Sequence, residues 1–198
     1  LLNAEESGVC WILTGWRIQL MKRPLWRTPL SAETWPRTMD GFLSDRDFRI
    51  FSGDELVAQA TSRWCLVSTH TGRVTRVTDT IRGAYILDSQ AVFSEALHTN
   101  GRSGPSAEET FSCVIGRRDI DTNHHVNNLH YLDYALEALP QEVFEHIPDT
   151  LEIVYRKQIL LGTPIRCLYQ LTDDDRHQVE ICSGEGKDIV HHAFLWFY

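Results

Sequence analysis

Most of the chain consists of apolar-rich segments separated by short polar turns. The segments are rich in Val, Ile, Thr, Trp and Phe, which favour strands, and breakers such as Ser52-Gly53-Asp54 and residues 183–186 divide them as hairpin turns do. The pattern therefore predicts an antiparallel sheet. The expected strands span residues 9–21, 30–35, 47–51, 56–67, 110–115, 151–160, 165–171, 178–182 and 189–198.

One segment has the spacing of a helix instead. Its apolar residues recur at steps of three and four, Asn127 or Asn128 can cap its start, and Pro140 follows its end. These apolar positions are Leu129, Leu132, Ala135, Leu136 and Leu139. A weaker pattern predicts a second helix over residues 88–97, and the Gly-, Ser- and Pro-containing stretch after it is typical of a linker.

The two sides of this linker resemble each other. Residues 48–53 align with 179–184, residues 56–60 with 189–193, Pro29-Leu30 with Pro164-Ile165, and Trp16-Arg17 with Tyr155-Arg156. The offset between the aligned segments changes slowly and in one direction, as it would between two copies of one unit with different loop lengths. The sequence therefore predicts an internal repeat.

The repeated unit is a strand, a helix and then four strands. A helix enclosed by a curved antiparallel sheet is an α+β arrangement of the hot-dog type, so we expect a tandem, or double, hot-dog. We expect a first hot-dog domain over residues 1–98, a linker over 99–107 and a second domain over 108–198. The first copy would lack its opening strand and helix, because their counterparts would precede residue 1; the chain is therefore expected to be a fragment or incompletely represented.

Composition narrows the possible functions. The 198 residues carry 19 Lys and Arg against 27 Asp and Glu, a net charge of −8, which argues against general nucleic-acid binding. No apolar stretch is long enough for a membrane helix, and no secretory signal is visible. The five cysteines form no C-x-x-C pair, so we expect reduced thiols in a cytoplasmic chain, with no metal site and no cofactor.

A polar run between residues 117 and 131 contains the strongest candidates for catalysis. If the chain is extended up to His125, the two-residue period places Asp121, Asn123 and His125 on one face. A carboxylate, an amide and an imidazole would then lie beside a helix N-terminus, where free N–H groups can stabilise negative charge on a carbonyl oxygen. The alternative is an ordinary turn and helix cap with exposed histidines.

These residues resemble a known family. The stretch Asp121-x-Asn123-x-His125-Val126-Asn127-Asn128-x-x-Tyr131 is similar to the catalytic signature of the acyl-acyl carrier protein thioesterases, the plant FatA and FatB type and their bacterial relatives. First-half segments that resemble the same family are Trp11-Ile12-Leu13-Thr14 with Trp16, Glu33-Thr34-Trp35-Pro36, Arg46-Asp47-Phe48, Ala60-Thr61-Ser62-Arg63-Trp64 and Thr71-Gly72-Arg73. The resemblance covers essentially the whole chain.

The resemblance implies hydrolysis of fatty acyl-acyl carrier protein to free fatty acid and holo-carrier protein. It also implies that Asp121, Asn123 and His125 are catalytic. We expect Asp121 to act as base, orienter or nucleophile, and Asn127 at the helix start to help bind substrate. Gln158 stands where the family has a catalytic Glu, and Ile159 where plant enzymes have Cys. An amide is neither a base nor a negative charge, so Glu-activated water is not available in this chain.

Substrate and partner contacts are expected elsewhere in the chain. Aromatic side chains of the first half would line an acyl channel or simply pack in the core; the candidates are Trp16, Trp35, Phe42 and Trp64. Because carrier proteins and this chain are both acidic, docking needs a local basic patch, for which the candidates are Arg117, Arg118, Arg156 and Lys157, with Lys22, Arg23 and Arg27 in the other half.

Other functions remain open at this stage. They are a hot-dog acyl-CoA thioesterase or dehydratase, and a non-catalytic acyl-binding protein in which Gln158 marks lost activity. A homodimer is also open. We expect a cytoplasmic location for a bacterial chain and the plastid stroma for a plant one, while the acyl chain length is not legible in the sequence.

Overall fold

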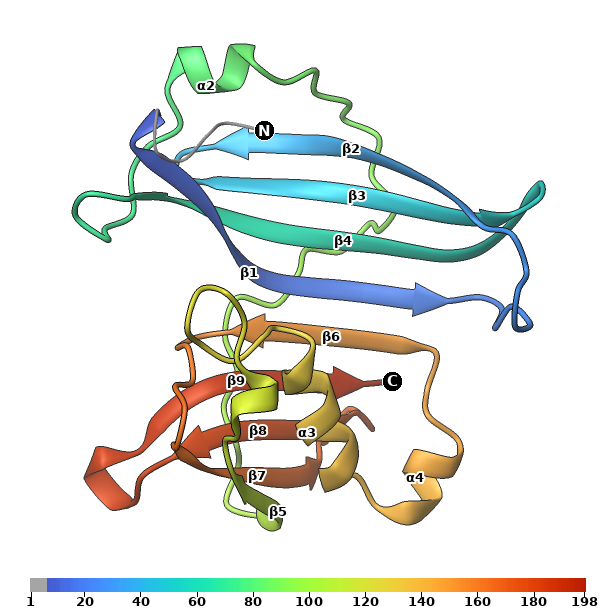
Figure 1. Ribbon diagram of the computed structural model, residues 1–198. Helices are drawn as coiled ribbons and strands as arrows, with labels where there is room; N and C mark the ends of the chain where they lie inside the picture. Colours follow the sequence, from blue (N-terminus) through green and yellow to red (C-terminus); the bar gives the residue numbers. More distant parts are fainter. Residues whose placement is uncertain (1–6) are drawn as a thin grey trace. The chain divides into compact units, whose positions relative to one another are not determined.

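The computed structural model describes residues 7–198, which divide between Leu97 and His98 into two compact units (Figure 1). Every strand pair described within each unit is antiparallel. The division falls one residue before the boundary expected at residue 98.

The first unit is a four-stranded sheet with one short helix. Its strands are β1 (Val9–Leu20), β2 (Ser31–Asp40), β3 (Leu43–Ser52) and β4 (Glu55–Ser68), in the order β2-β3-β4-β1. Gly53, with φ of +61°, provides the left-handed residue of the tight β3–β4 hairpin. The helix α2 (Asp79–Gly83) is capped at its start by Thr78, whose side chain accepts a hydrogen bond from the Ile81 amide.

The helix expected over residues 88–97 is absent from the structure, and that prediction was wrong. The segment has no regular secondary structure, because side chains of the sheet satisfy its main-chain groups. Asp47 accepts a hydrogen bond from the Val92 amide at 3.1 Å, and the Trp35 indole donates to the carbonyl of Gln90 at 2.8 Å. Arg17 donates to two further carbonyls of the segment. These contacts outweigh the weak helical periodicity.

The second unit contains the helix that the sequence predicted. Its strands are β5 (Glu108–Val114), β6 (Thr150–Tyr155), β7 (Pro164–Leu171), β8 (His177–Ser183) and β9 (Val190–Phe197), in the order β6-β9-β8-β7-β5. The helix α3 (His130–Ala138) packs against β5, β7, β8 and β9 and is followed by the short α4 (Gln141–Glu145) (Figure 1). Single 3₁₀ turns lie at η1 (Arg117–Asp119) and η2 (Gly186–Asp188).

The strand order confirms the internal repeat and the double hot-dog fold. The order β1-β4-β3-β2 in the first unit corresponds to β6-β9-β8-β7 in the second, as the offsets between the two halves predicted. Within residues 7–97 there is no counterpart of β5 and α3. Strand β6 ends at Tyr155, five residues before the predicted end, and the residues that follow form a loop.

The segment expected as a linker over 99–107 lies on the sheet of the second unit. We call residues 98–104 the strap. Gln178 donates to the Arg102 carbonyl at 3.2 Å, and the Gly104 amide donates to Gln170 at 2.8 Å. Gly101 lies so close to Phe194 that a Cβ atom would come within 2.2 Å of the Phe194 ring. The strap is therefore packed against the second unit.

No helix among residues 7–198 combines the length and apolarity that a membrane crossing requires.

Candidate functional site

The residues from Ile120 to Val126 form a tight turn and not an extended segment. Ile120 and Val126 form an isolated antiparallel bridge, and the Asp121 amide donates to the His125 carbonyl at 2.9 Å. His124 has a φ of +65°, a left-handed conformation that reverses the chain. This reversal, not a strand face, determines where the side chains of the turn lie.

The turn nevertheless brings the three predicted catalytic residues together. Asp121 accepts two hydrogen bonds from Asn123, one from the main-chain amide at 2.8 Å and one from the side-chain amide at 3.2 Å. The Nδ1 atom of His125 lies 3.8 Å from the nearer Asp121 oxygen. The side chains of His125 and Asp121 are 28% and 21% exposed, so water and a substrate can reach both.

These contacts set the charge of Asp121. Desolvation pushes its pKa upward, but the hydrogen bonds from Asn123 and the nearness of His125 outweigh desolvation, so the pKa lies below its ordinary value. Asp121 is therefore a carboxylate at neutral pH. Because a lowered pKa makes a weaker base, the geometry favours Asp121 as a fixed negative charge over Asp121 as a proton acceptor.

Asn127 shapes the beginning of α3. Its side-chain oxygen accepts a hydrogen bond from the Leu129 amide at 3.0 Å, and its carbonyl accepts one from the His130 amide at 2.9 Å. These bonds form a turn just before α3. The N-cap position is Leu129, which makes no side-chain capping bond, so the predicted capping by Asn127 or Asn128 was wrong. Two of the amides at the helix start are occupied by these bonds, which leaves fewer free N–H groups than the sequence suggested. The role of Asn127 in substrate binding stays a prediction.

Gln158 lies in the loop that follows β6. The Val126 amide donates to the carbonyl of Ile159 at 2.9 Å, so this loop runs directly beside the turn that holds the three polar residues. The side chain of Gln158 is exposed. The structure thus brings the position of Gln158 near the turn, while its part in the chemistry stays a prediction.

Comparison with known proteins identifies the family. The sequence model of the acyl-ACP thioesterase N-terminal domain matches residues 3–85, and that of the acyl-ACP thioesterase C-terminal domain matches residues 106–197. The chain belongs to the acyl-ACP thioesterase family. The catalytic-signature segment lies within the matched C-terminal domain.

Relatives of this thioesterase-family chain include plant proteins. Oleoyl-acyl carrier protein thioesterase 2 of Arabidopsis thaliana is 28% identical over 169 residues, which are 79% of this chain and 46% of that protein. Dodecanoyl-[acyl-carrier-protein] hydrolase of Cinnamomum camphora is 23% identical over 189 residues, 91% of this chain and 50% of that protein. The chain thus spans about half the length of the curated relatives it matches.

Solved structures of the family share the fold. An acyl-ACP thioesterase from Bacteroides thetaiotaomicron superposes with a TM-score of 0.82 at 21% identity, covering 98% of this chain and 79% of that one. The 12:0-ACP thioesterase from Umbellularia californica gives a TM-score of 0.82 at 22% identity, covering 99% and 77%. Both confirm the double hot-dog arrangement predicted from the sequence.

The aromatic residues predicted to line an acyl channel lie in different surroundings. Trp64 borders a cavity of about 120 Å³ in the first unit, smaller than the roughly 300–1,000 Å³ of most ligand pockets. Trp16 packs against Phe48 with ring centroids 5.0 Å apart, and Trp35 is fixed by its bond to the Gln90 carbonyl. Phe42 is 46% exposed. Their role as channel residues stays a prediction.

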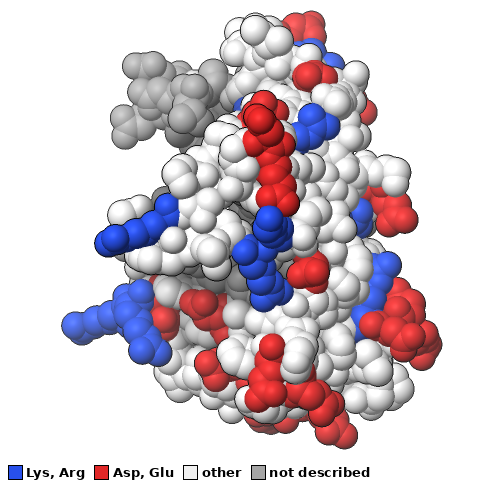
Figure 2. All heavy atoms as spheres, turned by 90° about the vertical axis from the view of Figure 1, so that its right-hand side faces the viewer, with Lys and Arg blue, Asp and Glu red and all other residues white. Residues whose placement is uncertain are grey.

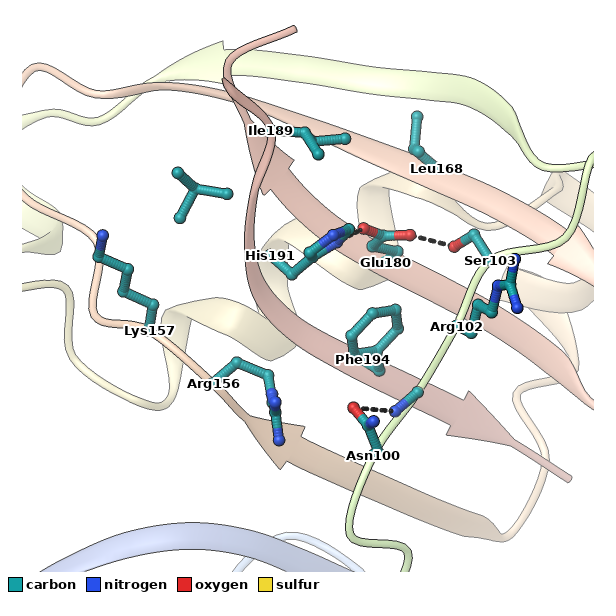
Figure 3. A pocket seen from close by; sticks show the side chains of 12 residues that line it. Asn100, Arg102, Ser103, Arg156, Lys157, Leu168, Glu180, Ile189, His191 and Phe194 are labelled. Carbon is teal, nitrogen blue, oxygen red and sulfur yellow. Dashed lines mark hydrogen bonds and ion pairs between the residues drawn. The ribbon is translucent and has the colours of Figure 1, made fainter. Parts of the chain in front are cut away.

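The four predicted carrier-protein residues lie at two separate hollows of the second unit. Arg117 and Arg118 border one of about 770 Å³, beside β5 and α3, and Arg156 and Lys157 border one of about 890 Å³, beneath the strap (Figure 3). All four are exposed. On the face shown in Figure 2, basic side chains are interspersed with acidic ones, so any basic patch there is small.

Sequence reasoning missed a set of buried polar groups under the strap and near the hairpin that joins β8 to β9. Glu180, only 2% exposed, bonds both Ser103 of the strap and His191 (Figure 3). His192 is 4% exposed and bonds Ser183. Two adjacent histidines in an otherwise apolar strand were the available signal. Among residues 7–198, no group of three or more His, Cys, Asp and Glu side chains is arranged to hold a metal ion.

Proposed function

We propose that this chain is the part of an acyl-ACP thioesterase that hydrolyses the thioester of a fatty acyl-acyl carrier protein, releasing free fatty acid and holo-carrier protein. The observation that carries the proposal is the turn in which Asp121 and Asn123 are hydrogen-bonded and His125 lies 3.8 Å away. Family membership and the match of both domains support it.

The chemistry starts with attack of a water oxygen on the thioester carbonyl carbon. His125 takes a proton from the water, since an imidazole exchanges protons near neutral pH. The carbon–sulfur bond then breaks, and the thiolate of the carrier's prosthetic arm receives the proton. The product is the fatty acid, which keeps the second proton of the water and loses it to solvent when it ionises.

Asp121 and Asn123 support this proton transfer. The Asp121 carboxylate stabilises the imidazolium that forms on His125, a charge interaction that strengthens as substrate excludes water from the site. Asn123 holds Asp121 through two donors and thereby keeps its charge aimed into the turn. Asn127 fixes the conformation of the chain at the start of α3, beside which the thioester carbonyl would lie. Asp121 as nucleophile remains the alternative route for the same three residues.

Gln158 is assigned the role of orienting the attacking water, not that of accepting its proton. Its amide can both donate and accept a hydrogen bond, so it can orient the attacking water without taking its proton. The exposed cations Arg117, Arg118, Arg156 and Lys157 would meet acidic groups of the carrier protein, because the net charge of −8 provides no long-range attraction. Plant relatives are named as chloroplastic proteins, and a plastid location is proposed here only for a plant chain.

One assay tests the proposal against the other functions. Fatty acid release is measured from acyl-acyl carrier protein and from acyl-CoA of equal chain length, using the full chain. We expect faster release from the carrier-protein substrate. Preference for acyl-CoA would favour an acyl-CoA thioesterase, and acyl binding without release would favour the binding protein that Gln158 in place of Glu suggests.

A further inference from the structure

The loop after β6 is held in place from two sides. On one side, the Val126 amide of the catalytic turn donates to the Ile159 carbonyl at 2.9 Å. On the other, the amides of Arg156 and Lys157 both donate to the main-chain carbonyl of His192 in β9, at 2.8 and 3.3 Å. Gln158 lies between these attachments, so the position of its side chain depends on both.

The side chain of His192 adds a third attachment to the same loop. Its Nδ1 atom lies 2.9 Å from the carbonyl oxygen of Lys157. A carbonyl oxygen only accepts hydrogen bonds, so Nδ1 carries the hydrogen and donates. The residue before Gln158 is thereby bound to β9 through both its amide and its carbonyl.

Ser183 completes the arrangement at the other ring nitrogen. Its hydroxyl lies 2.8 Å from Nε2 of His192, and both residues are buried, at 8% and 4% exposure. In the neutral ring with hydrogen on Nδ1, Nε2 is an acceptor and the hydroxyl of Ser183 donates to it. Burial lowers the pKa of His192, which keeps the ring in this neutral form.

An irregularity in the sheet aims the ring at the loop. In the β8–β9 ladder, Ile181 pairs with Ala193 and Cys182 pairs with His191, so His192 is an extra residue in β9. Such a bulge changes the direction of a side chain and is frequent beside active sites. In a regular ladder, His192 would pair with a residue of β8, and its side chain would not point toward the loop.

We propose that His192 is a positioning residue, which holds the Lys157 carbonyl so that Gln158 is presented to the water beside Asp121 and His125. The inference rests on the proposed function. His192 does not touch the substrate; it acts through the loop, and Ser183 selects the form of the ring that can donate.

Two substitutions of one residue separate positioning from packing. In His192→Asn the side-chain amide nitrogen takes the place of Nδ1 and can still donate to Lys157. In His192→Gln the longer side chain places its amide near Ser183, at the position of Nε2, and the bond to Lys157 is lost. Both replace a buried ring by a smaller amide, so they share any cost in packing. His146→Gln, at an exposed histidine that follows α4, serves as the control.

We expect His192→Gln to lower kcat for acyl-acyl carrier protein about tenfold or more with KM within about twofold, and His192→Asn to stay within about threefold of the unchanged protein. Amide hydrogen exchange gives an independent readout: Val126 should exchange about tenfold faster in His192→Gln than in His192→Asn. Equal losses of kcat in both variants, or equal exchange at Val126, would overturn the inference. If the unchanged protein releases no fatty acid, the proposed function fails and the exchange comparison alone decides whether His192 positions the loop.

Discussion

Changing Gln158 to Glu introduces a carboxylate at the position where the resemblance to the family implies a catalytic Glu. The two side chains are nearly the same size, and Gln158 is exposed, so the new charge stays hydrated. Substitutions at such positions change the free energy of unfolding by no more than about 0.5 kcal/mol. For a chain of this length, the melting temperature should therefore move by no more than about 2 °C.

The expected effect on rate follows from the position of the loop. The bond from Val126 to the Ile159 carbonyl, at 2.9 Å, keeps the carboxylate beside the turn that holds His125. A positioned base contributes about 10²- to 10⁴-fold, and a hydrated glutamate, with a pKa near its ordinary value of about 4.3, is a weak base at neutral pH. We therefore expect a gain at or below the lower end of this range, about tenfold to a hundredfold in kcat.

The dependence of rate on pH should change in a defined direction. The carboxylate is the active form, so the added rate is present above the ordinary pKa of a glutamate side chain and is lost as pH falls through about 4–5. The assay is fatty acid release across pH 4–9 for the unchanged protein and Gln158→Glu. Gln90→Glu adds the same charge at an exposed residue of the first unit and should leave the profile unchanged. A folded Gln158→Glu protein with an unaltered rate and profile would refute the assignment of this residue to the site.

Three further predictions concern the turn, the partner and the strap. Asp121→Ala and His125→Ala should each lower kcat about a hundredfold or more, and normal rates in both would place the chemistry elsewhere. Arg118→Gln should raise KM for acyl-acyl carrier protein more than for a short acyl thioester, with a smaller effect at high salt; equal changes would contradict a docking role. Gly101→Ala would bring a Cβ within 2.2 Å of the Phe194 ring. We expect this overpacking to destabilise the protein by about 1–3 kcal/mol and to lower the melting temperature, measured by calorimetry, by about 2–12 °C. An unchanged melting temperature would mean that the strap does not pack tightly against the ring.

The strands and the repeat were predictable from the sequence because burial of one face of a sheet selects a regular pattern of apolar and polar residues. Alternation and turn residues located the strands to within five residues at each end, and the drift in offset matched the shared strand order of the two units. The end of β6 was placed too late, because Ile159 and Leu160 continue the apolar pattern past Tyr155. Only Ile159 is buried there, and it lies in a loop.

Contacts between distant residues were not predictable in the same way. The segment 88–97 has a weak helical period, but its main chain bonds Asp47 and Arg17, which are far away in sequence. The strap contains Gly and Ser, as a flexible linker would, yet Gly101 is needed for its close approach to Phe194. Composition alone does not distinguish a glycine that gives freedom from one that permits close packing.

The same contrast explains why one part of the site could be named from the sequence and another could not. Asp121, Asn123 and His125 are brought together by bonds within a single turn, from the Asp121 amide to the His125 carbonyl and from Asn123 to Asp121. A site formed by such local contacts can be recognised in the sequence as a short motif. Gln158 depends instead on Val126 on one side and His192 on the other, which are distant in sequence from each other. Whether the Gln158 amide takes part in the reaction therefore depends on the conformation of its loop, and no motif of neighbouring residues predicts that conformation.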